Sequence, residues 1–203
     1  SYTFTCNLFD SNNSNTRTIN FGTGKIVVTT SGTTNVWNTS TITGLTISGT
    51  PLVQLTGGGA TTKTIVAGAL SEASAISFQL STTAGTVAFA NASTIKNLTI
   101  DNNSFTLSNI NITIYGNLTI AGTTPTLTAG ASVWTFASTS SQTITTNGKT
   151  LDFPLTFSGT GTYSLGDALT VGTATSRTVN LTTGTLELNS YTFTLYGLFS
   201  SSN

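Results

Sequence analysis

The stretch Arg17–Val28, RTINFGTGKIVV, recurs at Arg177–Leu188 as RTVNLTTGTLEL. The two segments align without a gap: five of the twelve positions are identical, and four more exchange one apolar residue for another. A Thr-rich chain produces short matches by chance, but both arginines of this chain occupy the first position of the match. An internal repeat of this length indicates a structure built from similar stacked units.

A second match joins the two ends of the chain. Residues 1–5, SYTFT, are identical to residues 190–194. Because Ser1 matches Ser190, one full coil can be counted from Arg177 to Ser190 and then from Ser1 to Arg17. This coil has about 29 residues, a suitable length for one solenoid repeat. We therefore expect residues 1–203 to be a single β-solenoid repeat unit, one copy of a tandem array, whose end restarts its own beginning.

Short segments in which threonine alternates with apolar residues recur along the chain, and this period of two is typical of β-strands. They are Tyr2–Thr5, Leu45–Ile47, Leu98–Ile100, Ile112–Ile114, Leu118–Ile120, Trp134–Phe136, Leu155–Phe157, Leu169–Val171 and Leu186–Leu188. Clusters of Gly, Asn and Ser separate them, as at 57–59, 147–148 and 158–161, and these predict turns. The only stretch with some helical potential is 67–75, where we expect one short turn at most.

The composition favours stacking of these strands. Thr, Ser, Asn and Gly make up 110 of 203 residues, whereas only 6% of residues are charged and the net charge is zero. In a parallel solenoid, like side chains of successive coils lie about 4.8 Å apart, where equal charges repel but hydroxyls and amides tolerate one another. We therefore predict an all-β, elongated parallel β-solenoid (β-helix) of stacked coils. An antiparallel β-sandwich is the alternative, since Asn-Gly turns are also hairpin signals.

The same composition excludes several kinds of function. The six basic residues are scattered and form no stripe for a phosphate backbone, so we expect no nucleic-acid binding. The chain has no histidine and one cysteine, Cys6, which leaves no Ser-His-Asp triad and no zinc site of the usual kind. We expect Cys6 to act as a small apolar residue in a strand. No apolar run is long enough for a membrane-spanning helix, so no membrane insertion is expected, and neither is a cofactor or a metal.

Three residues are the candidates for a contact with carbohydrate. Asp152 and Asp167 are the only two carboxylates close enough in sequence to lie on neighbouring edges, as a glycoside-cleaving pair must. Tyr163 could stack on a sugar ring if it lies on the surface. The simpler interpretation makes both aspartates turn residues and places the aromatic rings inside the coil.

The segments 142–157, 166–171, 177–180 and 198–203 resemble the Thr/Gly/Asn-rich tandem repeats of β-solenoid proteins from phage fibres and bacterial adhesin-like surface proteins. The resemblance implies a structural or adhesive role and carries no catalytic residues with it. It also implies a location outside the cell, on a cell surface or in a virion.

We therefore expect a non-catalytic structural or adhesive segment of an extracellular or virion fibre. The alternative is a bacterial cell-surface adhesin or extracellular filament subunit, and a lesser alternative is a carbohydrate-active β-helix enzyme. The expected partners are further copies of the chain, joined head to tail or as a trimer or filament, and a cell-surface glycan.

Overall fold

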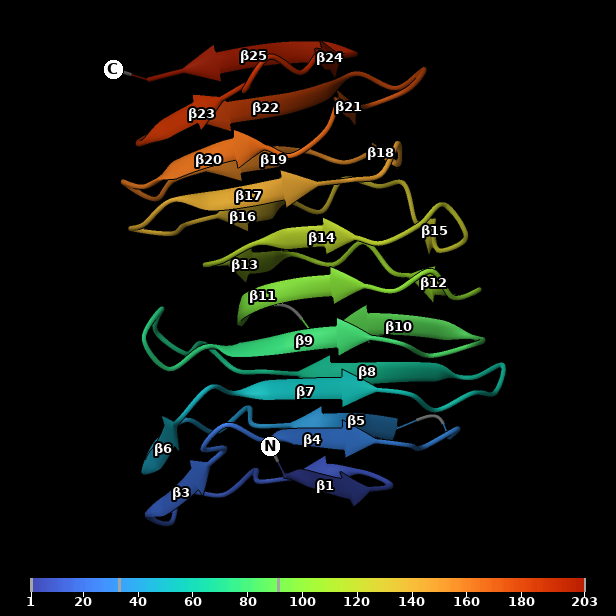
Figure 1. Cartoon of the computed structure of the whole chain (residues 1–203), viewed down its shortest axis with the longest axis vertical. Helices are drawn as coiled ribbons and strands as arrows, with labels where there is room; N and C mark the ends of the chain where they lie inside the picture. The colour runs from blue at the N-terminus through green and yellow to red at the C-terminus, as the bar shows by residue number, and fades with distance from the viewer. Residues whose placement is uncertain (1, 33, 91, 203) are drawn as a thin grey trace.

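The strands of the chain stack along one long axis (Figure 1) in a computed structural model that describes residues 2–32, 34–90 and 92–202. Every pair of neighbouring strands in these residues is parallel. The described part of the chain is an all-β parallel solenoid of about nine turns, as predicted. The alternative of an antiparallel sandwich is wrong, because the Gly- and Asn-rich turns connect different faces of the solenoid and form no hairpins.

The turns visit three faces in a fixed order, and only the third turn of the described residues has no strand on the third face. The first face consists of β1 (Thr3–Cys6), β4 (Lys25–Val28), β7 (Leu52–Leu55), β9 (Ile76–Leu80), the end of β11 (Ser93–Ile100), β14 (Leu118–Ile120), β17 (Gln142–Thr145), β20 (Thr162–Leu165) and β23 (Thr185–Glu187). The second face consists of β2 (Phe9–Asp10), β5 (Thr34–Asn38), β8 (Thr62–Val66), β10 (Thr86–Phe89), β12 (Thr106–Leu107), β15 (Thr126–Leu127), β18 (Thr150–Leu151), β21 (Leu169–Val171) and β24 (Phe193–Leu195). The third face consists of β3 (Arg17–Asn20), β6 (Leu45–Ser48), the start of β11, β13 (Ile112–Ile114), β16 (Trp134–Phe136), β19 (Leu155–Phe157), β22 (Arg177–Leu181) and β25 (Gly197–Ser201).

The coils differ in length. Arg17 pairs with Leu45 in an early coil and Ser93 pairs with Ile112 in a later one, so the later coil is shorter by about a third. The coil length expected from the two sequence matches therefore fits the spacing between Arg17 and Leu45 and overestimates the spacing between Ser93 and Ile112. In the third turn, β8 and β9 are joined by residues 67–75 without an intervening third-face strand.

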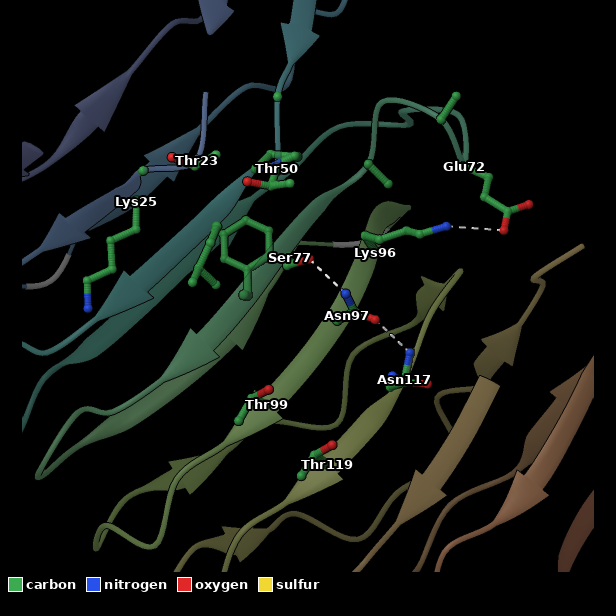
Figure 2. Close-up of a pocket in the computed structure, with 17 residues that line it drawn as sticks. Thr23, Lys25, Thr50, Glu72, Ser77, Lys96, Asn97, Thr99, Asn117 and Thr119 are labelled. Carbon is green, nitrogen blue, oxygen red and sulfur yellow. Dashed lines mark hydrogen bonds and ion pairs between the residues drawn. The ribbon is translucent and has the colours of Figure 1, made fainter. Parts of the chain in front are cut away.

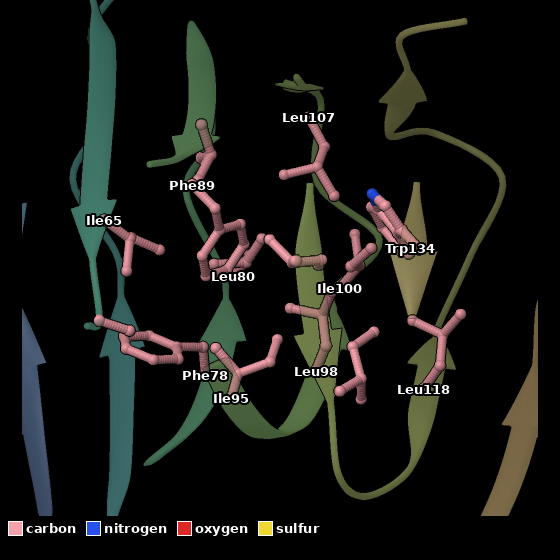
Figure 3. Packing of buried hydrophobic residues seen from close by; sticks show 14 of the residues in the cluster. Ile65, Phe78, Leu80, Phe89, Ile95, Leu98, Ile100, Leu107, Leu118 and Trp134 are labelled. Carbon is pink, nitrogen blue, oxygen red and sulfur yellow. The ribbon is translucent and has the colours of Figure 1, made fainter. Parts of the chain in front are cut away.

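One inward column runs the length of the first face. Its members oppose one another from coil to coil in the order Phe4, Ile26, Val53, Phe78, Leu98, Leu118, Ile144 and Leu165. All but the first are buried (Figure 3 shows the middle of the column). The period-two alternation creates this core, because every second side chain of a strand points to the same side.

Threonine forms the matching column on the outside. Thr94, Thr113, Thr135 and Thr156 oppose one another on four successive strands of the third face. Each follows an inward-facing residue, and the strands β13, β16 and β19 alternate between buried and half-buried positions. A column of stacked hydroxyls of this kind suits a composition that is poor in charged residues.

The two sequence matches have different outcomes. Residues 17–28 form β3 and β4 and residues 177–188 include β22 and β23, so the longer repeat occupies the third and first faces in both places. The shorter match does not, because Thr3 begins β1 on the first face whereas its counterpart Thr192 precedes β24 on the second. Ser1 itself lies outside the described residues.

The turn predicted at 147–148 and the short turn predicted within 67–75 are confirmed. Asn147 and Gly148 both have positive φ, at 50° and 76°, and the amide of Lys149 closes the turn on the carbonyl of Thr146 at 3.0 Å. Residues 72–74 form a single turn, in which the amide of Ala75 donates to the carbonyl of Ser71 at 2.8 Å.

Candidate functional site

Asp152 lies at the corner between β18 and β19 and forms an ion pair. Its Oδ1 accepts a hydrogen bond from Arg177 Nε at 2.8 Å, and its Oδ2 accepts one from Thr173 Oγ1 at 3.0 Å. The bond from Arg177 lowers the pKa of the Asp152 carboxyl below its ordinary value, against the opposing effect of burial. This carboxylate therefore joins two successive coils.

We expect Asp152→Asn to lower stability by about 1.5–3 kcal/mol, the range for a hydrogen bond to a charged group. A carboxyl with a lowered pKa stabilises the fold above its ordinary pKa, and this contribution is lost as the pH falls through the lower value in the fold. The wild-type chain should therefore lose stability below about pH 3.8, the ordinary aspartate value. Urea unfolding at pH 7 and pH 3 measures both effects. If variant and wild type differed by the same free energy of unfolding at both pH values, the stabilising role of the ionised Asp152 carboxylate would be contradicted.

Asp167 lies at a different corner, between β20 and β21. Its carboxylate accepts hydrogen bonds from the backbone amides of Thr146, at 2.9 Å, and Asn147 in the preceding coil. Asp152 thus follows a strand of the second face and binds Arg177 of the next coil. Asp167 follows a strand of the first face and binds the turn at Asn147 of the preceding coil. The simpler interpretation of both as turn residues describes their contacts fully.

The expectation that Tyr163 contacts carbohydrate from the surface is wrong. Its side chain is 1% exposed and packs against Phe136 and Phe157, with ring centroids 5.2 and 5.6 Å away. Its hydroxyl donates to the carbonyl of Ile114 at 3.2 Å and accepts from the amide of Ser138 at 2.9 Å. Burial raises the pKa of Tyr163 to about 12. The ring fills the core because Tyr163 shares the inward parity of Leu165 on β20.

A groove of about 750 Å³ crosses the first face beside its corner with the third (Figure 2). It runs over β4, β7, β9, β11 and β14, five neighbouring strands that together span about 19 Å at 4.8 Å per step. Its labelled polar side chains are Thr23, Lys25, Thr50, Glu72, Ser77, Lys96, Asn97, Thr99, Asn117 and Thr119.

Glu72 reaches into this region from the loop that replaces a third-face strand. Its carboxylate pairs with Lys96 Nζ at 3.2 Å and accepts hydrogen bonds from Ser138 Oγ at 2.9 Å and Thr139 Oγ1 at 2.8 Å. Burial alone would raise the pKa of Glu72, but these hydrogen bonds lower it below its ordinary value. The loop is thereby tied to a coil 66 residues further along the chain.

Asn97 and Asn117 form a ladder in the lining of the groove. Asn97 Oδ1 accepts from the amide of Asn117 at 2.8 Å, Asn97 Nδ2 donates to Ser77 Oγ at 3.0 Å, and Asn117 Oδ1 accepts from the amide of Thr143 at 2.7 Å. These bonds tie the side chains to neighbouring coils, while the hydroxyls of Thr99 and Thr119 in the same lining can donate and accept hydrogen bonds. Sequence reasoning missed the groove, although the triplets Asn97-Leu98-Thr99 and Asn117-Leu118-Thr119, 20 residues apart, were its visible signal.

Sequence reasoning also did not identify a lysine as inward-facing. Lys63 on β8 is 1% exposed, and its Nζ donates to the carbonyls of Gly59 and Ala84, each at 3.1 Å. Burial lowers the pKa of Lys63. The amine satisfies carbonyl groups at the corner after the glycine run 57–59.

The two ends of the described solenoid are the places where large apolar side chains are exposed. At one end these are Tyr2, Phe4 and Leu8, and at the other Leu188, Tyr191, Tyr196, Leu198 and Phe199; Ile42 is the one further case in the described residues. An apolar hollow of about 390 Å³ opens at the C-terminal end, lined by Leu181, Leu186, Leu188, Phe193, Leu195 and Phe199. Neither β1 nor β25 has a strand on its outer edge in this part of the chain.

The remaining candidate chemistry is limited. Cys6 packs against the core from β1, and burial raises the pKa of its thiol. Within the residues that the structure describes, no three His, Cys, Asp or Glu side chains gather as a metal site would require. In the part of the chain that the structure describes, no helix has the length and the apolar character needed to cross a membrane.

A scan against protein-family models, a search of curated proteins and a search of solved structures each returned no match. The comparisons therefore identify no phage fibre or adhesin as a relative.

Proposed function

We propose that the chain is a non-catalytic structural or adhesive segment of an extracellular or virion fibre. The observation that supports this most is the continuous inward column, which passes from Phe4 to Leu165 through successive coils. In a solenoid of this kind each coil contacts mainly its neighbours, so length can be added without a new core. Such a rod separates what is attached at its two ends.

The lesser alternative, a carbohydrate-active enzyme, needs two carboxylates over one substrate. Asp152 and Asp167 follow different faces, and both are held by contacts within the solenoid. The pair therefore lends this alternative no support.

A glycan partner remains part of the proposal, and the groove over β4 to β14 suits it better than Tyr163 does. Thr99 and Thr119 present outward hydroxyls in one column beside the asparagine ladder. Binding of the chain to an array of cell-surface glycans tests this partner, and signals no higher than those of an unrelated β-solenoid would contradict it.

The role as a fibre segment is tested where the protein occurs. Antibodies raised against the chain should, in immunogold electron microscopy, label filaments or virion appendages along their length. Gold confined to the cytoplasm would overturn the proposed function and location together.

A further inference from the structure

We infer that the loop of residues 67–75 is a latch, which joins the fourth, fifth and sixth turns of the solenoid into one unit that opens as a whole. The loop lies in the third turn, between β8 and β9. Figure 2 draws Glu72 on this loop, with its ion pair to Lys96 on β11. The inference goes beyond the proposed function, because it concerns how the coils separate and not what the rod connects.

The contact of Glu72 with Ser138 and Thr139 crosses three turns. On the third face, β11, β13 and β16 pair in succession, and Ser138 follows β16 at the end of the sixth turn. At about 4.8 Å per coil, the contact spans about 14 Å along the axis. Among the described residues these hydrogen bonds have the largest sequence separations, 66 and 67 residues, and the next largest is 49.

The base of the loop is fixed to the coil that follows it. Leu70 packs in the core, and its carbonyl accepts a hydrogen bond from Thr94 Oγ1 at 2.7 Å. The amide of Thr94 donates to the carbonyl of Gly68 at 2.9 Å. Glu72 therefore extends from an anchored base, and its carboxylate is held in place to reach the sixth turn.

The receiving corner is also fixed. Ser138 is fully buried, and its amide donates to the hydroxyl of Tyr163 at 2.9 Å, which ties this corner to the core of the eighth turn. Thr139 donates to Glu72 Oε2 from its amide at 3.1 Å and from its hydroxyl at 2.8 Å. Hydrogen bonds to an ionised acceptor are about twice as strong as those between neutral groups. The latch thus ends in strong bonds between two anchored segments.

The latch changes how the coils can separate. In a solenoid whose coils contact only their neighbours, the outermost folded coil detaches without disturbing the others. Detachment from the C-terminal side reaches Ser138 and Thr139 before the fourth and fifth turns, and detachment from the N-terminal side reaches Glu72 before them. From either side, the bonds of Glu72 must break before the enclosed turns are released. A load high enough to break these bonds should release the three turns together.

Stretching single molecules between their two ends tests the latch. We expect the wild-type chain to release the 66 residues between Glu72 and Ser138 in one step of about 220 Å, at about 3.3 Å per extended residue. Glu72→Ala should release them in smaller steps, one coil at a time. The matched control, Lys96→Gln, removes only the ion pair of Glu72 with a nearer coil and should keep the single step. Small steps in the wild type, or one step in Glu72→Ala, would overturn the inference.

Hydrogen exchange provides a second test, without a load. Glu72→Ala should speed exchange in the enclosed strands β14 and β16 by about tenfold or more, as loss of a hydrogen bond to a charged group does. Exchange in β21 and β24, which lie beyond the latch, should not change. Thr139→Val, at an exposed residue, removes one donor of the same contact and should speed exchange in the same strands.

The double variant completes this test. Because both substitutions remove one contact, Glu72→Ala with Thr139→Val should exchange no faster than Glu72→Ala alone. Circular dichroism confirms that each variant folds, and Thr139→Val alone still tests the latch if Glu72→Ala does not fold. Equal acceleration inside and beyond the latch, or additive effects in the double variant, would overturn the inference.

Discussion

Leu118→Asp should unfold the chain or lower its stability by about 5 kcal/mol or more, which is comparable to the total stability of many domains. Leu118 is fully buried between Leu98 and Ile144 in the inward column of the first face. A carboxylate there would have no cation to pair with among the core residues around it. Loss of the β-sheet signal in circular dichroism, or a large shift of the urea midpoint, measures the effect.

The adjacent residue supplies the control. Thr119 points outward and is opposed by Thr99 and Thr145, so Thr119→Asp adds one solvated charge with no like charge beside it. We expect it to change stability by about 0.5 kcal/mol, as surface substitutions usually do. Similar losses for the two variants would show that β14 does not alternate between core and solvent.

Gly57→Ala should lower stability by about 3 kcal/mol, at the upper end of the usual cost of overpacking. A Cβ atom at Gly57 would lie 2.8 Å from the carbonyl oxygen of Thr29 and would overlap the carbonyl group of Thr30. Both obstacles are backbone atoms of the preceding coil, so relief requires the coils to separate. Thermal unfolding monitored by circular dichroism measures the loss.

Gly32→Ala makes the same chemical change at an exposed glycine in a neighbouring corner. A Cβ atom at Gly32 would meet only Thr30 Oγ1, at 3.6 Å, which is ordinary contact. We expect a change within about 0.5 kcal/mol. A Gly57→Ala variant as stable as Gly32→Ala would contradict the close stacking of the second and third coils.

The strands and the fold class were predictable because they depend on local patterns. The alternation at Ile112–Ile114 and Trp134–Phe136 became β13 and β16 with the same boundaries. The repeat beginning at Arg17 and Arg177 marked equivalent corners. The shorter repeat beginning at Ser1 was misleading, since strands on any face of a solenoid share the same Thr-apolar alternation.

The site was less predictable because it depends on register between coils. Tyr163 could be placed inside only once its strand parity was known, and Asp152 found its partner in Arg177, 25 residues away. The approach of Glu72 to Ser138 across 66 residues follows from a loop that replaces a strand, and no local pattern encodes it. The coils also vary in length along the chain, so a fixed period cannot predict which residues oppose one another.

The central claim is that the chain is a rod of parallel coils stacked along one long axis. A crystal structure or a cryo-electron microscopy map of the chain measures this directly. About nine turns at 4.8 Å each predict a stack about 43 Å long with a regular 4.8 Å repeat between strands. Strands paired antiparallel in hairpins, or strands of one coil that do not stack on those of the next, would contradict the account.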